Sequence, residues 1–293
     1  MSPPRQRRPA TRGCRAAATL RAMIPSPSPR SNESAPAVPL PADDPDLLTL
    51  DLRGLRQRWA TAAARPPMTA EAMAGADHRA QARGIPGERL MEHAGTAVAA
   101  AARALAIDTE RWGNGPIVIM VGPGNNGGDG LVAARHLAAI GVPVVVALVA
   151  SGPRPSSPDA RRNWDRIVRD ARITIVHTPV ARDVSMLGQG IEKAAIVVDA
   201  LLGTGVRGEL REPIRSAVEI VNAARAALVP VLAVDTPTAV DLTSGDPSDP
   251  AVRADLTVTF HRPKTGLLTR NGAALAGRIL VAPIGIPQEA DRG

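Results

Sequence analysis

Short apolar runs alternate with longer amphipathic stretches from residue 117 to the end of the chain. The runs have strand length and most are continuous, which is typical of parallel strands covered on both faces. They span residues 117–121, 144–149, 172–176, 195–199, 229–234, 256–260 and 278–282. Helical spacing occurs between them, at residues 127–140, 157–170 and 211–227. The sequence therefore predicts an α/β fold, a three-layer α/β/α sandwich around a mostly parallel, Rossmann-like sheet.

Two further helices are predicted ahead of the first strand. Thr69 can cap a helix that runs from residue 70 to about residue 83. A Gly-Ile-Pro break follows, and a second, alanine-rich helix runs from about residue 86 to 105. The small side chains of this second helix permit close packing on a neighbouring helix or sheet. We expect the ordered domain to begin near Met68 and to span residues 67–293.

The first part of the chain has a different composition. Residues 1–42 are rich in Pro, Arg, Ser and Ala without helical or strand periodicity, and residues 47–64 have only a loose helical pattern. Such a segment buries too little apolar surface to offset its ordering entropy. We therefore expect residues 1–66 to form a disordered basic extension. Its arginine-rich start is shared by organelle transit peptides and by disordered bacterial extensions.

Charge and composition exclude several classes of protein. The formal net charge is +7, but residues 1–66 hold eleven arginines against five acids, so the remainder is close to neutral. With one Phe and no Tyr as well, we expect no nucleic-acid partner. The single cysteine, Cys14, excludes an intramolecular disulfide and a cysteine zinc site. No apolar run approaches the ~20 residues of a membrane helix, and we expect a cytoplasmic protein.

Polar residues gather in three loops, each directly after a predicted strand. The first loop reads Gly-Asn-Asn-Gly-Gly-Asp-Gly at residues 124–130. The second begins at Asp199 and the third at Asp235, and both are rich in Gly, Thr or Pro. Ligands of such sheets bind beyond the carboxyl ends of the strands. An aspartate at the end of a buried strand is costly unless it has a partner. The three loops therefore predict a shared polar cleft.

The first loop is not an ordinary dinucleotide-binding fingerprint. The spacing of Gly122, Gly124 and Gly127 fits G-x-G-x-x-G, which alone is a weak signal. The next strand ends in Ala150 and Ser151, without the acid that binds a ribose 2′-hydroxyl. The sequence therefore disfavours an NAD-dependent dehydrogenase.

Taken together, these motifs resemble those of a known family, the YjeF N-terminal domain, whose enzymatic members are NAD(P)H-hydrate epimerases. The resemblance covers about residues 68–287, and the Asn-Asn-Gly-Gly-Asp-Gly loop is its most specific part. The other matching segments are Met68 to Met73, Asp77, Leu90 to Gly95, Asp199 with Gly203-Thr204-Gly205, Asp235-x-Pro237, Phe260 to Gly266, and Ile284 to Pro287.

The resemblance implies a substrate and one potassium ion per subunit. The substrate is hydrated NADH or NADPH (NADHX, NADPHX), which carries a hydroxyl at C6 of the nicotinamide ring. Interconverting its R and S forms feeds a separate, S-specific NAD(P)H-hydrate dehydratase, and family members often form homodimers. The implied potassium ligands are Asn126, Asp199 and Thr238, with backbone carbonyls. The implied substrate-binding residues are Asn125, Asn126, Gly127, Gly128, Asp129, Gly203, Thr204, Gly205, Val206, Arg207, Gly208, Glu209 and Asp235.

C6 of this substrate bears both a hydroxyl and the ring nitrogen, so it is a carbinolamine. Inversion requires loss and return of the hydroxyl, or opening and closing of the ring, and either route needs a proton donor and acceptor. We expect Asp235 to be catalytic, with Lys264 as its polar partner. Asp129 either braces the first loop or touches the substrate.

The third loop departs from the family pattern. Thr238 keeps a hydroxyl, but Ala239 replaces a glycine and adds a Cβ where the chain can need a positive φ. Thr243 replaces an acid, and we expect Asp241 to shape a turn. These changes favour an alternative function, a non-catalytic nucleotide- or protein-binding module, whereas the complete first and second loops favour the enzyme.

Overall fold

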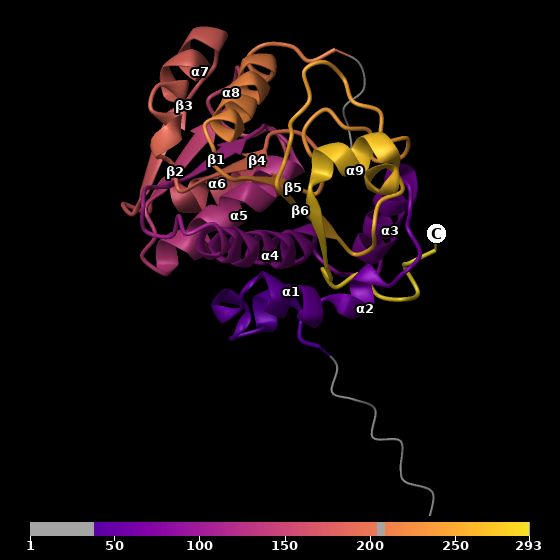
Figure 1. Ribbon diagram of the computed structural model, residues 1–293. Coiled ribbons are helices and arrows are strands. Elements are labelled where there is room, and N and C mark those ends of the chain that lie inside the picture. The colour runs from indigo at the N-terminus through magenta and orange to yellow at the C-terminus, as the bar shows by residue number, and fades with distance from the viewer. Residues whose placement is uncertain (1–37, 204–208, 293) are drawn as a thin grey trace, which may run out of the picture. The chain divides into compact units, whose positions relative to one another are not determined.

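The computed structural model describes residues 38–203 and 209–292. These residues form a seven-stranded sheet in the order β3-β2-β1-β4-β5-β6-β7 (Figure 1). All neighbouring strands are parallel, where the sequence predicted a mostly parallel sheet. The strands are β1 (Ile117–Val121), β2 (Val144–Leu148), β3 (Ile173–His177), β4 (Ile196–Ala200), β5 (Val231–Val234), β6 (Leu256–Phe260) and β7 (Arg278–Ala282).

Helices cover both faces of the sheet, as the continuous apolar strands predicted. The α-helices are α1 (Leu52–Arg58), α2 (Ala60–Ala63), α3 (Ala70–Ala82), α4 (Gly87–Asp108), α5 (Asn125–Ala139), α6 (Pro158–Ile167), α7 (Ala181–Gly188), α8 (Ile214–Ala226) and α9 (Arg270–Ala276). Side chains of α1, α4, α5 and α6 share one core with the sheet. Side chains of α7 and α8 form a second core on the other face. The three-layer arrangement is therefore confirmed.

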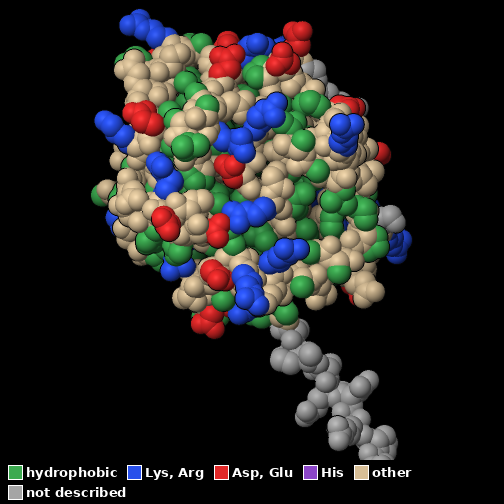
Figure 2. Space-filling view, in the orientation of Figure 1, with side chains coloured by type: hydrophobic (Ala, Val, Ile, Leu, Met, Phe, Trp, Pro, Cys, Tyr) green, Lys and Arg blue, Asp and Glu red, His purple; other side chains and the backbone are tan. Residues whose placement is uncertain are grey.

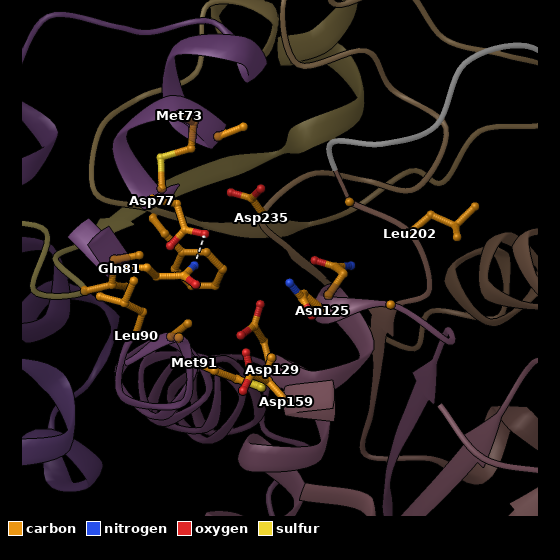
Figure 3. Close-up of a pocket in the computed structure, with 18 of the residues that line it drawn as sticks. Met73, Asp77, Gln81, Leu90, Met91, Asn125, Asp129, Asp159, Leu202 and Asp235 are labelled. Atoms are coloured by element: carbon orange, nitrogen blue, oxygen red, sulfur yellow. Dashed lines mark hydrogen bonds between the residues drawn. The ribbon is translucent and has the colours of Figure 1, made fainter. Parts of the chain in front are cut away.

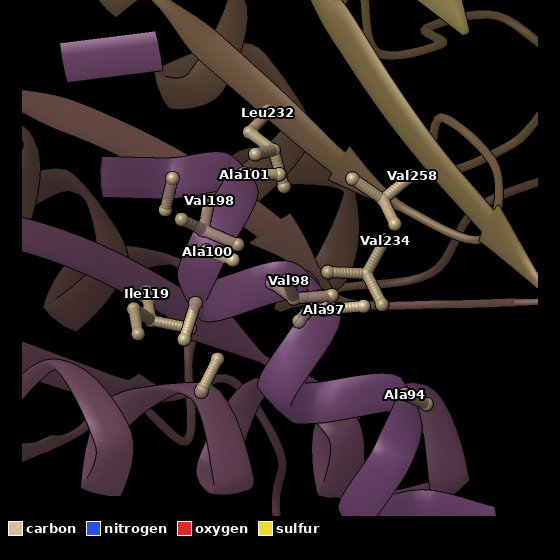
Figure 4. Close-up of a cluster of buried hydrophobic side chains, with 14 of the residues drawn as sticks. Ala94, Ala97, Val98, Ala100, Ala101, Ile119, Val198, Leu232, Val234 and Val258 are labelled. Carbon is tan, nitrogen blue, oxygen red and sulfur yellow. The ribbon is translucent and has the colours of Figure 1, made fainter. Parts of the chain in front are cut away.

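The alanine-rich helix α4 lies directly on the sheet (Figure 4). Ala97, Ala100 and Ala101 are at most 1% exposed and belong to the same core as Val198 of β4 and Leu232 of β5. Side chains this small let the helix axis approach the strands closely, as the sequence predicted. At the N-terminal end of α3, Thr69 caps the helix through a 3.1 Å hydrogen bond from Ala72 N to Thr69 Oγ1.

The ordered part of the chain begins well before residue 67. Residues from Val38 onward belong to the same compact unit as the sheet. Leu47, Leu55 and Trp59 are at most 2% exposed and pack in the α4 core. The expected disordered extension therefore does not reach residue 66, because these three apolar side chains secure an otherwise polar segment. Residues 1–37, where the rest of that expectation falls, lie outside the described residues.

The surface in Figure 2 carries Lys and Arg side chains interspersed with Asp and Glu. On this face the two signs of charge alternate rather than gather into one basic patch. None of the described helices is both long enough and apolar enough to span a bilayer.

Candidate active site

Three strand-end loops meet where the strand order reverses. β1 lies between β2 and β4, so the chain leaves β1 toward one side of the sheet and later returns to the other. At the carboxyl ends of β1, β4 and β5 lies a cavity of about 500 Å³ (Figure 3). Residues of all three predicted loops line it, and much of its remaining wall comes from α3 and α4 through Met73, Asp77, Leu90 and Met91. The predicted shared cleft is present.

Glycines bring the first loop close to the neighbouring backbone. A Cβ on Gly122 would lie 1.8 Å from the carbonyl oxygen of Leu201, which follows β4. A Cβ on Gly127 would lie 2.1 Å from the carbonyl oxygen of Gly122. Helix α5 begins at Asn125, inside this loop, with Gly124 as an N-cap that has no side-chain hydrogen bond. Its free N–H groups and dipole favour negative charge at this end of the cavity.

The implied substrate-binding residues divide into four groups. Asn125, Asn126, Asp129, Gly203 and Asp235 line the cavity. Gly127 and Gly128 are buried behind it, and Glu209 borders a different hollow with Arg215. The stretch Thr204 to Gly208 lies outside the described residues.

Asp199 and Thr238, two of the implied potassium ligands, are in direct contact. Thr238 Oγ1 donates to Asp199 Oδ1 at 2.6 Å, and Thr238 N donates to Asp199 Oδ2 at 2.7 Å. Asp199 is fully buried, and burial raises its pKa to about 6 against the opposing effect of these hydrogen bonds. No Lys, Arg or His pairs with it among the described residues. Its negative charge is therefore uncompensated by protein.

The third implied ligand, Asn126, lies on the first turn of α5 beside the second loop. A Cβ on Gly203 would be 3.3 Å from Asn126 Oδ1. The buried Nδ2 atom of Asn126 has no hydrogen-bond partner in the described part of the chain. A carboxylate, an amide and a hydroxyl suit a large monovalent cation of low charge density. Residues 38–203 and 209–292 contain no cluster of three or more His, Cys, Asp or Glu suited to a metal.

Asp235 stands at the centre of a tight three-residue turn at the end of β5. Its φ is 61°, and Thr236 N donates to Val234 O at 2.7 Å across it. A positive φ is costly for a residue with a Cβ, and such strain concentrates at functional sites. The turn aims the carboxylate of Asp235 into the cavity, where it faces Asp129 (Figure 3).

Lys264 is fully buried behind Asp235. Its ammonium donates to Asp235 Oδ1 at 3.1 Å, to Thr259 Oγ1 at 2.8 Å and to the Phe260 carbonyl at 2.9 Å. Thr259 in turn donates to Asp235 Oδ1 at 2.9 Å. The structure therefore brings together the two residues that the sequence suggested as partners. Thr259 was not foreseen, although its position on the inward face of β6, beside Phe260, could have indicated it.

A second turn of the same kind fixes the carbonyls that hold Lys264. His261 has a φ of 66°, and Arg262 N donates to Phe260 O at 2.7 Å. Burial, followed by the charges of Arg65, Lys264 and Arg262, lowers the pKa of His261 to about 3, so the ring is neutral. Its Nε2 lies 3.1 Å from Asp291 Oδ1. No pattern in the sequence indicates this contact.

The third loop forms a hydrogen-bonded turn with the substituted residues in place. Ala239 has a φ of 72°, which confirms that a Cβ stands at a left-handed position. Asp241 Oδ1 accepts from Thr243 N at 2.7 Å and from Ser244 N at 2.8 Å, so Asp241 shapes the turn as expected. Thr238 retains its contacts with Asp199 through these changes.

Comparisons with known proteins agree with the motifs. The family described as YjeF-related protein N-terminus matches residues 87–266. The NAD(P)H-hydrate epimerase of Cenarchaeum symbiosum is 40% identical over 204 residues, covering 70% of this chain and 88% of that protein. The bifunctional NAD(P)H-hydrate repair enzyme Nnr of Methanothermobacter thermautotrophicus is 44% identical over 224 residues, covering 75% of this chain. The chain spans only 40% of that relative.

A solved structure gives the same picture. The crystal structure of yeast ynu0 superposes with a TM-score of 0.59 and 25% identity, covering 69% of this chain and 83% of the yeast chain.

Proposed function

Because this chain belongs to the family of YjeF-related protein N-termini, we propose that it is an NAD(P)H-hydrate epimerase, an isomerase. It interconverts the R and S forms of hydrated NADH and NADPH at C6 of the nicotinamide ring. The observation that carries this proposal is the Asp235–Lys264 pair at the wall of the cavity. A carboxylate oriented by a buried ammonium is a suitable group for moving a proton at a carbinolamine.

Each part of the site has a role in this proposal. The N-terminus of α5, with Asn125, binds polar or anionic parts of the substrate. Asp235 takes or returns the proton at C6, and Lys264 and Thr259 hold its carboxylate in one orientation. Leu90, Met91 and Phe260 provide apolar wall for the ring. Loss and return of the hydroxyl and opening of the ring both need these groups.

The product of this reaction belongs to a two-step repair. The relatives named bifunctional repair enzymes are longer chains, of which this chain matches only a part. We infer that an S-specific NAD(P)H-hydrate dehydratase consumes the S form that this chain supplies. The alternative, a non-catalytic binding module, gains no support from the comparisons, and the altered third loop still holds Thr238 against Asp199.

An epimerisation assay tests the proposal. A mixture of the R and S hydrates of NADH is incubated with an excess of an S-specific dehydratase, in potassium buffer, with and without this protein. Without it, only the S fraction should disappear quickly. With it, the R fraction should follow, and NADH should recover fully. An R fraction that decays at its spontaneous rate in both samples would reject the epimerase.

Potassium is expected to stabilise the fold through Asp199, Asn126 and Thr238. At ten times its Kd, the ion should add about 1.4 kcal/mol to the unfolding free energy, which raises Tm by about 3–6 °C. Its physical basis is the uncompensated charge of Asp199. Thermal melts in potassium, sodium and choline chloride at equal ionic strength measure the effect. Asp199→Asn should remove it, and equal Tm values in all three salts would contradict the site.

A further inference from the structure

Two carboxylates enter the cavity from opposite sides and have opposite surroundings. Asp235 contacts the ammonium of Lys264 and the hydroxyl of Thr259. Asp129 is 9% exposed, points into the cavity (Figure 3), and has no hydrogen-bond or ion-pair partner among the described residues. The surroundings of Asp235 therefore stabilise a negative charge, whereas no described residue compensates a negative charge on Asp129.

Close packing of α4 against α5 fixes the position of Asp129. A Cβ on Gly95 of α4 would lie 2.6 Å from the Asp129 carbonyl and 2.3 Å from Val132 Cβ. Met91, one turn earlier on α4, packs against Gly128. The backbone of α5 at Asp129 therefore has a fixed position at the wall of the cavity. The helix dipole favours a negative charge only within the first turn of α5, and Asp129 lies beyond that turn.

The charges that face Asp129 are all negative. They come from Asp235 after β5, Asp77 on α3 and Asp159 on α6. No Lys or Arg is among the described residues that line the cavity. Arg162 pairs with Asp159 on the outside, and Lys264 lies behind Asp235. Burial first, and then these three carboxylates, raise the pKa of Asp129 well above its usual range.

We propose that Asp129 is a catalytic residue, the carboxylic acid that donates a proton to the C6 oxygen of the substrate from the side opposite the Asp235 carboxylate. This inference rests on the proposed epimerase function and assigns its proton donor. Pairs of titratable groups whose surroundings favour opposite protonation states are the usual source of acid and base in one site.

The proton-transfer step balances as follows. The Asp129 carboxyl proton passes to the C6 hydroxyl, the C6–O bond breaks, and water leaves. The lone pair of the ring nitrogen forms the C6–N double bond. Water then adds to the opposite face of C6, and the Asp235 carboxylate takes its proton. Exchange with solvent returns a proton to Asp129 and removes one from Asp235, and no oxidant or reductant is required.

A bracing role for Asp129 predicts contacts that are absent from the described residues. A carboxylate that stabilises a loop accepts backbone N–H groups, as Asp241 does from Thr243 and Ser244. Asp129 accepts none, so its side chain is available to the substrate.

The kinetic test compares Asp129→Asn with Asp165→Asn in the coupled assay. Asp165 is a carboxylate of α6 that pairs with Arg154 and does not line the cavity. We expect Asp129→Asn to lower kcat about 100-fold with KM changed less than about threefold, and Asp165→Asn to lower kcat less than about threefold. The wild-type rate should fall as pH rises through the Asp129 pKa, and this fall should be absent from the residual activity of Asp129→Asn.

A second measurement needs no activity. A raised pKa leaves the folded protein stable at low pH and costs stability as pH rises from the unfolded value toward the folded value. The Tm of Asp129→Asn minus that of wild type should therefore grow between about pH 4 and neutral pH. A difference that is already constant by pH 5 would show that Asp129 is ionised at neutral pH and would overturn the proposal.

The outcomes separate the two claims. A wild-type protein that fails to epimerise rejects the proposed function. A wild-type protein that epimerises, together with Asp129→Asn at full kcat, rejects the donor role alone. If Asp129→Asn is inactive, melts like wild type near pH 4 and shows a Tm difference that grows toward neutral pH, the donor role is supported.

Discussion

Replacing Asp235 with asparagine is expected to reduce epimerisation about 1,000-fold, the largest effect of any single substitution in this site. The carboxylate is the only group of the cavity with a buried ammonium and a hydroxyl directed at it among the described residues. Asparagine keeps the size and can accept a hydrogen bond, but it cannot take a proton. Removal of a general base typically costs 100- to 10,000-fold in rate.

The coupled assay measures this loss, and two variants serve as controls. Asp246→Asn removes the same charge from an exposed position in the same loop and should change the rate less than twofold. Asp235→Asn also leaves the buried Lys264 without its counter-charge, which can lower stability. The double variant Asp235→Asn with Lys264→Met removes that orphan charge. If the double variant melts like wild type and keeps the full rate, Asp235 is not the base.

Gly122→Ala is expected to destabilise the protein by about 3 kcal/mol, which corresponds to roughly 10 °C in Tm. The added Cβ would stand 1.8 Å from the Leu201 carbonyl oxygen, a backbone atom that side-chain rotation cannot move. Gly122 N also donates to the Ala200 carbonyl at 3.0 Å. Relief of the clash therefore requires the loops after β1 and β4 to separate.

Gly124→Ala is the matched control for this change. The residue lies two positions later in the same loop, its φ is −93°, and a Cβ there would meet nothing within 4 Å. Its stability should change by less than about 1 kcal/mol, mainly through the weaker N-cap. Chemical denaturation of both variants measures the difference. Equal unfolding free energies would show that the close approach of the two loops is not rigid.

The strands were predictable from sequence because most are short, continuous apolar runs that are buried on both faces of the sheet. Helices α7 and α9 were not foreseen, since each is short and contributes few buried side chains. The segment around Leu55 and Trp59 was misjudged for another reason. Its helical pattern is weak in the sequence, and a few buried apolar side chains decide that it folds.

The site was predictable only as far as strand ends reveal it. Asp199 and Asp235 stand at the ends of apolar runs, so a parallel sheet places both of them at the same edge. The contact of His261 with Asp291 joins a turn after β6 to the chain's last described residues, and no periodicity encodes such a contact. The raised pKa of Asp129 also depends on three carboxylates from other elements, which only the folded chain brings together.

The reversal of strand order at β1 has a consequence for how the protein folds. The Asn-Asn loop belongs to the half of the chain that forms β1, β2 and β3, whereas Asp199, Thr238 and Asp235 belong to the half that forms β4 to β7. Pairing of β1 with β4 joins strands separated by about 75 residues, a non-local contact of the kind that slows folding. The cavity is complete only when this contact has joined the two halves. A ligand that contacts both halves stabilises the folded state by holding the halves together.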